Sequence, residues 1–352
     1  MRLLPALPYL LAACSGAVAE RPKVIADAAR FAPAAAALMA DSASICWQRF
    51  SRGEPIEASC TSLGVTSRVD TVRQAFVPFA FGPGDMYRGP NAAQGFTAGQ
   101  SYADPQGLVA LLAKLRANQQ RAFLALTGGA HCQYLTTGCD EKNQPKPGGV
   151  FDLAKWKAGT ARYATPVLKA ALEAGVADGT ILGYNMLDEP PHPSWGGVFT
   201  KALVDTMAAY CKSILPFMPC GVAVNYRWRP TERYDLVDFV MTQTWMETQS
   251  PAAFLDSAVA MAKRDGVALV LSLNLFGAAP SPGCEPRGSQ CLMRPAEVRE
   301  WGRAFVSEPY ACAVIMWRYD ATMWGRPEYQ AQFQDVSSLA GQRVAKSCRR
   351  PS

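Results

Sequence analysis

The sequence predicts an α/β fold of the (β/α)8 type, a TIM barrel whose first half is irregular. Three observations carry this prediction. From about residue 74, short apolar runs typical of strands alternate with amphipathic segments typical of helices. The strands are apolar along their whole length, as in parallel sheets that helices cover on both faces. The alternating region spans about 280 residues, which is enough for one closed barrel.

Seven segments have the length and composition of buried strands. An eighth strand has to come from before residue 74 or be irregular. A doubly wound open sheet is the alternative, but no G-x-G-x-x-G follows the first strand, so dinucleotide binding lacks its usual signal. The expected strands are residues 76–82, 121–129, 179–190, 220–228, 236–245, 267–277 and 312–320.

Helices are expected between these strands. The first should begin with Asp104 as its N-cap and Pro105 at its first position. The second contains Pro166, which should break it because proline cannot donate a backbone hydrogen bond. The expected helices are residues 104–120, 151–175, 199–215, 251–266, 294–308 and 327–346.

The N-terminus has the features of a secretory signal. Arg2 precedes an apolar stretch at residues 3–13, which is too short to span a bilayer. Cleavage after Ala19 would make residues 1–19 the signal peptide. Cleavage before Cys14, at a stretch that resembles a bacterial lipobox, would instead give a lipidated Cys14 and membrane attachment. The protein is therefore expected to be secreted, or a periplasmic or outer-surface lipoprotein.

The remaining organisation is simple. Residues 20–73 are weakly patterned and Ala-rich, and we expect a weakly structured leader there. Residues 74–348 should form the barrel. The net charge of +6 is spread along the chain, without a basic cluster interleaved with aromatics, which disfavours nucleic acid as a partner. We expect a monomer.

The cysteines support export to an oxidising compartment. The chain has eleven, and ten remain if Cys14 is lipidated or removed. An even number in an exported chain favours disulfides. With only two histidines, the spacings do not resemble a zinc site, and we expect no metal and no cofactor. The hypothesis of sequential pairing joins Cys46 to Cys60, Cys132 to Cys139, Cys211 to Cys220, Cys284 to Cys291 and Cys312 to Cys348.

Paired carboxylates end the third expected strand. The apolar run at residues 181–187 leads directly into Asp188 and Glu189. Barrel active sites lie at the C-terminal ends of the strands. Adjacent residues in a strand point to opposite faces, so one of the two carboxylates should face the barrel mouth.

The other strand ends carry a mixture of aromatic, amide and charged side chains. Aromatic rings pack on the C–H faces of sugars, amides hydrogen-bond hydroxyls, and carboxylates perform acid–base chemistry. A structural role is open for each: the aromatics as core rim, His131 as a structural histidine, and Asp320 as a partner of Arg318. The candidate binding residues are Asp188, His131, Asn225, Tyr226, Trp228, Gln243, Trp245, Asn274, Trp317 and Trp195.

Two strand motifs resemble those of clan A glycoside hydrolases. The run ILGYNMLDEP resembles the fourth-strand motif, in which the Glu is the general acid/base, so the resemblance assigns that role to Glu189. The run CAVIMWRYD is similar to the last barrel strand, whose Trp, here Trp317, forms a platform under the sugar. The likeness covers the order of elements over about residues 74–345. It implies a TIM barrel that acts on an oligosaccharide or polysaccharide.

The sequence also departs from this family. Asp188 replaces an Asn, and Asn274 stands where the family has a nucleophilic Glu on strand seven. Asp320 is the first choice for the second carboxylate, because a strand end holds it, and Glu247 is the second. Glu285, in the loop after Asn274, is a further choice.

Other readings of this departure remain open. Asp188 could assist Glu189, or the barrel could be a non-catalytic carbohydrate-binding protein of the cell surface. A metal-dependent hydrolase that uses Asp188, Glu189, His131 and His192 is a further alternative.

Overall fold

The structure is a computed structural model, and all the residues that it describes belong to one compact unit, Gln74–Ser352. The first unit of the chain, Met1–Arg73, lies outside the described residues, and so do the expected signal peptide and leader. The domain boundaries therefore stay predictions. The described residues are 77–84, 95–127, 131–139, 145–190, 198–225, 233–245, 249–280, 282–287, 290–317 and 319–351.

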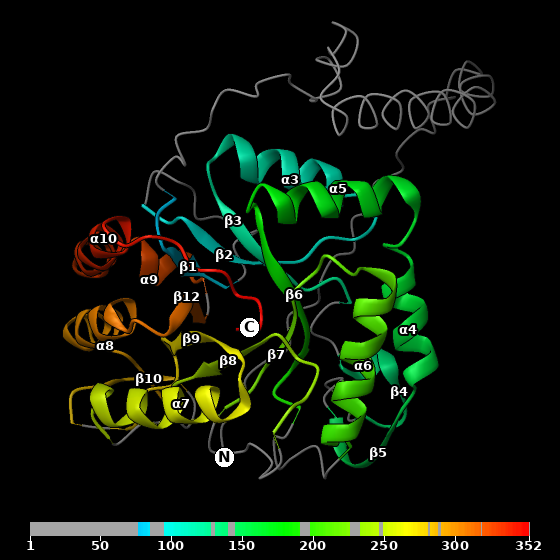
Figure 1. The fold of residues 1–352 in the computed structure, drawn as a ribbon. Coiled ribbons are helices and arrows are strands. Elements are labelled where there is room, and N and C mark those ends of the chain that lie inside the picture. The colour runs from blue at the N-terminus through cyan, green and yellow to red at the C-terminus, as the bar shows by residue number, and fades with distance from the viewer. Residues whose placement is uncertain are drawn as a thin grey trace, which may run out of the picture. The chain divides into compact units, whose positions relative to one another are not determined.

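Eight parallel strands form one sheet that curves into a barrel (Figure 1). Their order is β1-β12-β9-β8-β7-β6-β3-β2. From β2 to β12 each strand therefore pairs with the next of the eight in chain order, and β1 pairs with β12. β6 is fourth in chain order and β9 is seventh. The strands are β1 (Ala80–Pro83), β2 (Ala98–Ser101), β3 (Arg121–Leu124), β6 (Ile181–Asp188), β7 (Cys220–Ala223), β8 (Phe239–Gln243), β9 (Ala268–Asn274) and β12 (Ala311–Trp317).

The first and second strands nearly close the barrel. The backbone N–H of Thr97, just before β2, donates to the carbonyl oxygen of Phe81 in β1 at 3.0 Å. The Thr97 hydroxyl also donates to the carbonyl oxygen of Phe79 at 2.7 Å. With helices following the strands around the outside, this arrangement confirms the predicted TIM-barrel class.

The eighth strand is β2, which lies after residue 74, so of the two expected origins the first was wrong and an irregular strand is found. Its four residues, Ala-Gly-Gln-Ser, contain no β-branched or aromatic side chain and carry no strand signal of their own. Tertiary packing forms the strand, because β1 approaches closely at Gly82. A Cβ atom on Gly82 would lie 1.7 Å from the Ala98 carbonyl oxygen, so only glycine fits there.

The helices lie close to their expected positions, with one correction at the first. α3 begins at Leu108 rather than near Asp104, whose Oδ1 instead accepts the N–H of Gly107 at 2.6 Å and closes the preceding turn. The expected break at Pro166 is confirmed. The helices are α3 (Leu108–Ala117), α4 (Leu153–Ala161), α5 (Pro166–Ala177), α6 (Lys201–Ile214), α7 (Pro251–Asp265), α8 (Pro295–Ser307), α9 (Ala321–Trp324) and α10 (Pro327–Gly341).

Additional elements follow the C-terminal ends of two strands. After β3 come a 3₁₀ turn, His131–Tyr134, and the hairpin formed by β4 (Leu135–Cys139) and β5 (Pro145–Phe151). After β9 comes the hairpin of β10 (Glu285–Arg287) and β11 (Gln290–Leu292). Neither hairpin was expected from the sequence. Both extend the face of the barrel where active sites lie.

One aromatic ring, that of Phe239, belongs to the cluster of buried residues inside the barrel. Phe239 is fully buried and contacts the ring of Phe123, with 5.0 Å between ring centroids. Cβ atoms on Gly183 and Gly221 would lie 2.6 Å and 2.4 Å from the Phe239 ring. The absence of side chains at these two positions therefore makes room for the ring.

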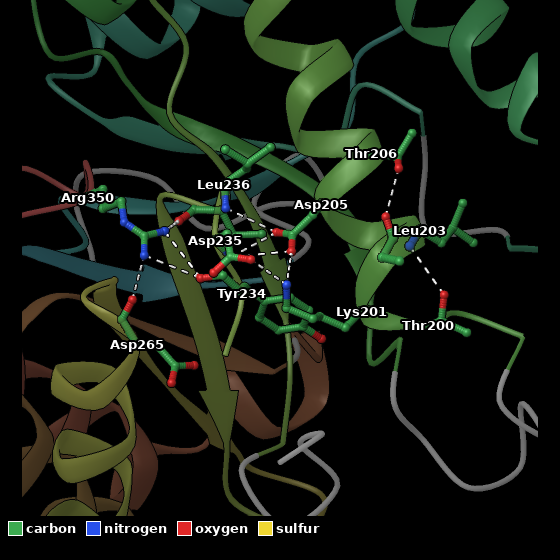
Figure 2. A network of polar contacts seen from close by, with 12 residues as sticks. Thr200, Lys201, Leu203, Asp205, Thr206, Tyr234, Asp235, Leu236, Asp265 and Arg350 are labelled. Carbon is green, nitrogen blue, oxygen red and sulfur yellow. Dashed lines mark hydrogen bonds and ion pairs between the residues drawn. The ribbon is translucent and has the colours of Figure 1, made fainter. Parts of the chain in front are cut away.

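An irregular segment before β8 is held against α6. The N–H groups of Asp235 and Leu236 each donate to Asp205 Oδ1 at 3.1 Å. Lys201 then pairs with Asp205 at 2.8 Å and with Asp235 at 2.6 Å (Figure 2). The Asp205 carboxylate thus accepts hydrogen bonds from backbone N–H groups that have no partner in a helix or sheet.

The C-terminal tail crosses the opposite end of the barrel, where the strands begin. Cys348 is disulfide-bonded to Cys312 at the start of β12, and both belong to the cluster of buried residues inside the barrel. The guanidinium of Arg350 donates to the Val237 carbonyl oxygen at 2.9 Å. It also donates to the Asp265 carbonyl oxygen at 2.6 Å (Figure 2). The tail thus ties together the segments that lead into β8 and β9.

Three predicted disulfides are confirmed: Cys211–Cys220, Cys284–Cys291 and Cys312–Cys348. Cys132 is also disulfide-bonded. Its pairing with Cys139 stays a prediction, and the pair Cys46–Cys60 lies outside the described residues. Among the helices that the structure describes, none has the length and apolar character needed to cross a membrane.

Candidate functional site

The fourth barrel strand ends in a backbone conformation that is rare for a residue with a side chain. β6 is buried up to Leu187, and Asp188 is exposed. The next residue, Glu189, has φ = 47°, in the left-handed region that favours glycine. Its backbone N–H donates to the Ala223 carbonyl oxygen of β7 at 2.7 Å, which fixes the turn. Non-glycine residues held in this region cluster at functional sites.

Hydrogen bonds join the ends of three neighbouring strands around Glu189. The side-chain amide of Gln243, at the end of β8, donates to Glu189 Oε1 at 2.7 Å. Asn225, which follows β7 and is fully buried, donates from Nδ2 to the Gln243 carbonyl oxygen at 3.1 Å. The structure therefore brings together three of the residues that the sequence singled out.

The surroundings of Glu189 favour its protonated form. Burial raises the pKa of its carboxyl group, the negative charge of Asp188 raises it further, and the hydrogen bond from Gln243 lowers it; the net effect is a pKa of about 8. The expectation that one acid of the pair faces the barrel mouth stays a prediction. Near neutral pH, Glu189 can donate a proton.

Asn274 ends the seventh strand, where the resembled family has its nucleophile. Its side chain is almost fully buried, and Oδ1 accepts the N–H of Phe276 at 3.2 Å. Its backbone N–H donates to the hydroxyl of Thr244 at 2.9 Å. The side chain thus shapes the turn that follows β9. Sequence reasoning missed Thr244, although it follows directly on Gln243 at a strand end.

Two predicted aromatic residues are partly exposed at strand ends. Trp317 ends β12, and its carbonyl oxygen accepts the N–H of Leu275 at 2.8 Å. A Cβ atom on Gly84 would lie 3.1 Å from the Trp317 ring, so the indole lies against the end of β1. Trp245 follows β8 and is also partly exposed. Both positions suit a platform for an apolar ring face.

The choices for a second carboxylate differ in their surroundings. Asp320 is the N-cap of α9, and its Oδ1 accepts the N–H of Met323 at 2.9 Å, which is a structural use of this side chain. Glu285 in β10 pairs with both terminal nitrogens of Arg326, at 2.7 Å and 3.3 Å. Glu247 lies outside the described residues.

Several other predicted site residues cannot be placed in this arrangement. Trp195, Tyr226 and Trp228 lie outside the described residues, as does His192. His131 begins the 3₁₀ turn after β3, but its side chain lies outside the described part of the structure. Within the described ranges, no three His, Cys, Asp or Glu side chains are grouped so that they could hold a metal ion.

Comparisons with known proteins give structural similarity only. No protein-family model and no curated protein sequence matches this chain. Among solved structures, a GH18 chitinase, ChiB, from Flavobacterium johnsoniae is 11% identical, with a TM-score of 0.40 over 74% of this chain and 94% of that chain. Xylanase B from Clostridium stercorarium F9 is 12% identical, with a TM-score of 0.40 over 72% and 90%.

A third similar structure is a β-glucuronidase from Ruminococcus gnavus. It is 11% identical, with a TM-score of 0.43, and the match covers 64% of this chain and 38% of that chain. All three neighbours are glycoside hydrolases. The TIM-barrel class of this chain rests on its own strand order and pairing.

Proposed function

We propose that this protein is a glycoside hydrolase that cleaves an oligosaccharide or polysaccharide, with Glu189 as its general acid/base. The observation that carries the proposal is the state of Glu189 at the end of the fourth strand. Its pKa of about 8 keeps it protonated at neutral pH, and its oxygen is held at 2.7 Å from Gln243. A protonated carboxyl group at the barrel mouth is what protonation of a glycosidic oxygen requires.

Gln243 and Asn225 orient the acid in this proposal. The Gln243 amide fixes one oxygen of Glu189, and Asn225 fixes the backbone of Gln243 in turn. The acid is therefore held from two neighbouring strands rather than from a loop alone. Such positioning keeps the proton donor in place while the substrate binds. Trp317 and Trp245 would pack against sugar rings.

The second carboxylate of the reaction is proposed as Asp320, Glu247 or Asp188. A retaining enzyme needs its two carboxyl groups about 5–5.5 Å apart, and an inverting enzyme needs about 6.5–9.5 Å. Asp320 lies three residues after the end of β12, and one of its oxygens already caps α9. Asp188 is exposed and its charge acts on Glu189. The anomeric form of the first product would decide between the two geometries.

The test is release of reducing sugar from a broad panel of glycans by the protein and by Glu189→Gln. The variant keeps the size of the side chain and removes its proton, so we expect a loss of about 10²- to 10⁴-fold in turnover. Glu300→Gln, on an exposed position of α8, is the matched control and should keep full activity. Equal activity of Glu189→Gln and the unchanged protein would contradict the acid role.

A non-catalytic carbohydrate-binding barrel is the second candidate function. The observation in its favour is Asn274, which stands at the end of strand seven and uses its side chain in a turn. Under this alternative, no glycan in the panel releases reducing sugar, while at least one binds measurably. Binding would then be unaffected by Glu189→Gln.

We also propose that the protein works outside the cytoplasm. Its three described disulfide pairs are typical of proteins in oxidising compartments. Secretion and lipidation at Cys14 lead to different products, and mass spectrometry of the mature N-terminus distinguishes them.

A further inference from the structure

A pocket of about 150 Å³ lies beside the candidate site, between the ends of β8 and β9 and the first turns of α8. A cavity of this size holds a single six-membered ring. Neither Glu189 nor Gln243 is among its lining residues, so the pocket is separate from the contact between them. Its lining residues are Thr244, Asn274, Gly277, Ala278, Ala279, Met293, Arg294, Glu297 and Trp301.

A buried amide contributes an unused donor to this pocket. Asn274 is only 3% exposed, and its Oδ1 is engaged by the N–H of Phe276. Its Nδ2 has no hydrogen-bond partner among the described residues. A Cβ atom on Gly277 would lie 2.7 Å from Nδ2, so the amide needs the glycine beside it. Nδ2 is therefore available to donate to a ligand that enters the pocket.

The charges that line the pocket compensate one another. Arg294 and Glu297 form an ion pair, and the Glu297 carboxylate also accepts the Arg294 backbone N–H at 2.8 Å. The guanidinium has five N–H donors, so the pair leaves several available. Because the pair is neutral as a unit, it offers donors and acceptors to hydroxyl groups without attracting an anion.

The walls of the pocket are firmly held. Ala278 exchanges two backbone hydrogen bonds of 3.0 Å with Cys291, which is disulfide-bonded to Cys284. The Met293 carbonyl oxygen accepts the hydroxyl of Tyr329 at 2.7 Å. On the other side, Trp301 is packed edge-on against Phe254, which fixes its indole. A pocket with such fixed walls is suited to bind a ligand without rearrangement.

The position of the pocket relates it to the proposed acid. Thr244 follows Gln243, whose amide contacts Glu189. Two strand spacings, about 10 Å, separate β8 from β6. A sugar ring bound in the pocket would therefore be part of the same glycan as the cleaved bond. It would be a different ring from the one next to that bond.

We propose that this pocket is a subsite for one neutral pyranose ring of the glycan, with the Asn274 amide and the Arg294–Glu297 pair as its hydroxyl-binding groups. The identification of the ligand as part of the substrate rests on the proposed function. The pocket selects chain length, because only a glycan that extends from Glu189 toward β9 can reach it.

Titration calorimetry of the Glu189→Gln variant, which holds a glycan without cleaving it, tests the proposal. The probes are cello-, xylo-, manno- and maltotetraose, with tetragalacturonic acid as an anionic comparison. Ala279→Phe, added to Glu189→Gln, should fill the pocket and lower the affinity for the bound neutral tetraose about tenfold or more. Ala113→Phe, on an exposed position of α3, is the matched control and should change nothing.

The outcomes separate the pocket from the acid. Loss of neutral tetraose binding in the Ala279→Phe variant supports the subsite even if the protein with Glu189 intact cleaves no glycan, a result that would overturn only the proposed hydrolysis. The protein with Glu189 intact could cleave glycans while Ala279→Phe leaves the tetraose affinity of Glu189→Gln unchanged. That result overturns the subsite alone. Binding of no neutral probe, or tighter binding of tetragalacturonic acid than of every neutral probe, also overturns it.

Discussion

The two ends of the barrel use polar groups in opposite ways. At the end where the strands begin, the charged groups of the tail have partners: Arg350 donates to backbone carbonyl oxygens, and Arg343 does so to those of Val306 and Ala311. At the end where the strands finish, Glu189 has a strained backbone and a raised pKa, and the Asn274 amide has a donor without a described partner.

This difference separates stability from function. Saturated hydrogen bonds stabilise the folded state and a disulfide destabilises the unfolded chain, so the tail end should carry much of the stability. A protonated carboxyl group and an unused amide donor raise the free energy of the folded state, and folded proteins keep such features where they bind or react. Substitutions at the tail end should therefore affect mainly stability, and substitutions at the end where the strands finish should affect mainly activity or binding. The following predictions test that division.

The largest expected effect is the loss of turnover in Glu189→Gln, described above, with the fold retained. The corresponding change at the other end is Arg350→Gln, which removes charged donors to the Val237 and Asp265 carbonyl oxygens. We expect it to lower the melting temperature and leave the rate of glycan cleavage within about twofold. A loss of turnover in Arg350→Gln at a temperature where it is folded would contradict the assignment of stability to one end and function to the other.

The second prediction concerns stability and pH. The folded protein holds a proton on Glu189 up to a pKa of about 8, whereas the unfolded chain releases it near 4.5. Between these values the folded state binds more protons, so this group's contribution to the free energy of unfolding falls as pH rises. Glu189→Gln removes that contribution and should be more stable than the unchanged protein above pH 8, by a few kcal/mol.

Urea unfolding of both proteins at pH 5 and pH 9 measures this difference. The stability advantage of Glu189→Gln should be larger at pH 9 than at pH 5. Glu300→Gln, exposed on α8, controls for the loss of a carboxylate and should show no such dependence. An advantage that is equal at both pH values would argue against a raised pKa.

The third prediction compares a disulfide at each end. Cys312–Cys348 closes a loop of 36 residues at the tail end, and Cys284–Cys291 closes one of 7 residues beside the pocket. Removing the disulfide that closes the longer loop should cost about 4 kcal/mol, more than removing the other, because the longer cross-link restricts the unfolded chain more. Melting curves of the two Cys→Ala double variants measure this order.

The two variants should also differ in function. Loss of Cys284–Cys291 should weaken tetraose binding, since the wall at Ala278 is attached to Cys291. Loss of Cys312–Cys348 should leave binding unchanged at temperatures where the protein is folded. A reversed pattern would contradict the division between the two ends.

The smallest predicted effect is a pair of opposite shifts in the pH profile of cleavage. The charge of Asp188 raises the pKa of Glu189, and the hydrogen bond from Gln243 lowers it. Asp188→Asn should therefore move the fall in kcat/KM at alkaline pH to lower pH, and Gln243→Leu should move it to higher pH, each by about one unit. Shifts in the same direction would mean that the fall reports another group.

Much of the fold could be predicted because its signals are local. Pro166 breaks a helix through its own chemistry, and the apolar runs mark the central strands wherever they pack. β2 could not be predicted, because its four residues become a strand only through the close approach at Gly82. The start of α3 was misplaced because Asp104 can cap either a turn or a helix.

The candidate site likewise has features with local sequence signals and features that depend on tertiary packing. Glu189 was recognisable from the sequence because an apolar strand ends in carboxylates, and Gln243 because it ends another strand. The left-handed backbone and raised pKa of Glu189 arise from packing and from the neighbouring charge of Asp188, which no local sequence pattern shows. Of the proposed subsite, only Asn274 was recognisable from the sequence, because Arg294 and Trp301 line the same pocket only once α8 packs beside the loop after β9.

The pKa of Glu189 itself is the most direct test of this account. It can be measured by carbon NMR of the protein labelled at the glutamate carboxyl carbons, with Glu189→Gln to assign the resonance. The account predicts a titration midpoint of about 8, far from that of the exposed glutamates. A midpoint near 4.5 would mean that Glu189 is ionised at neutral pH, and it would contradict the role of proton donor.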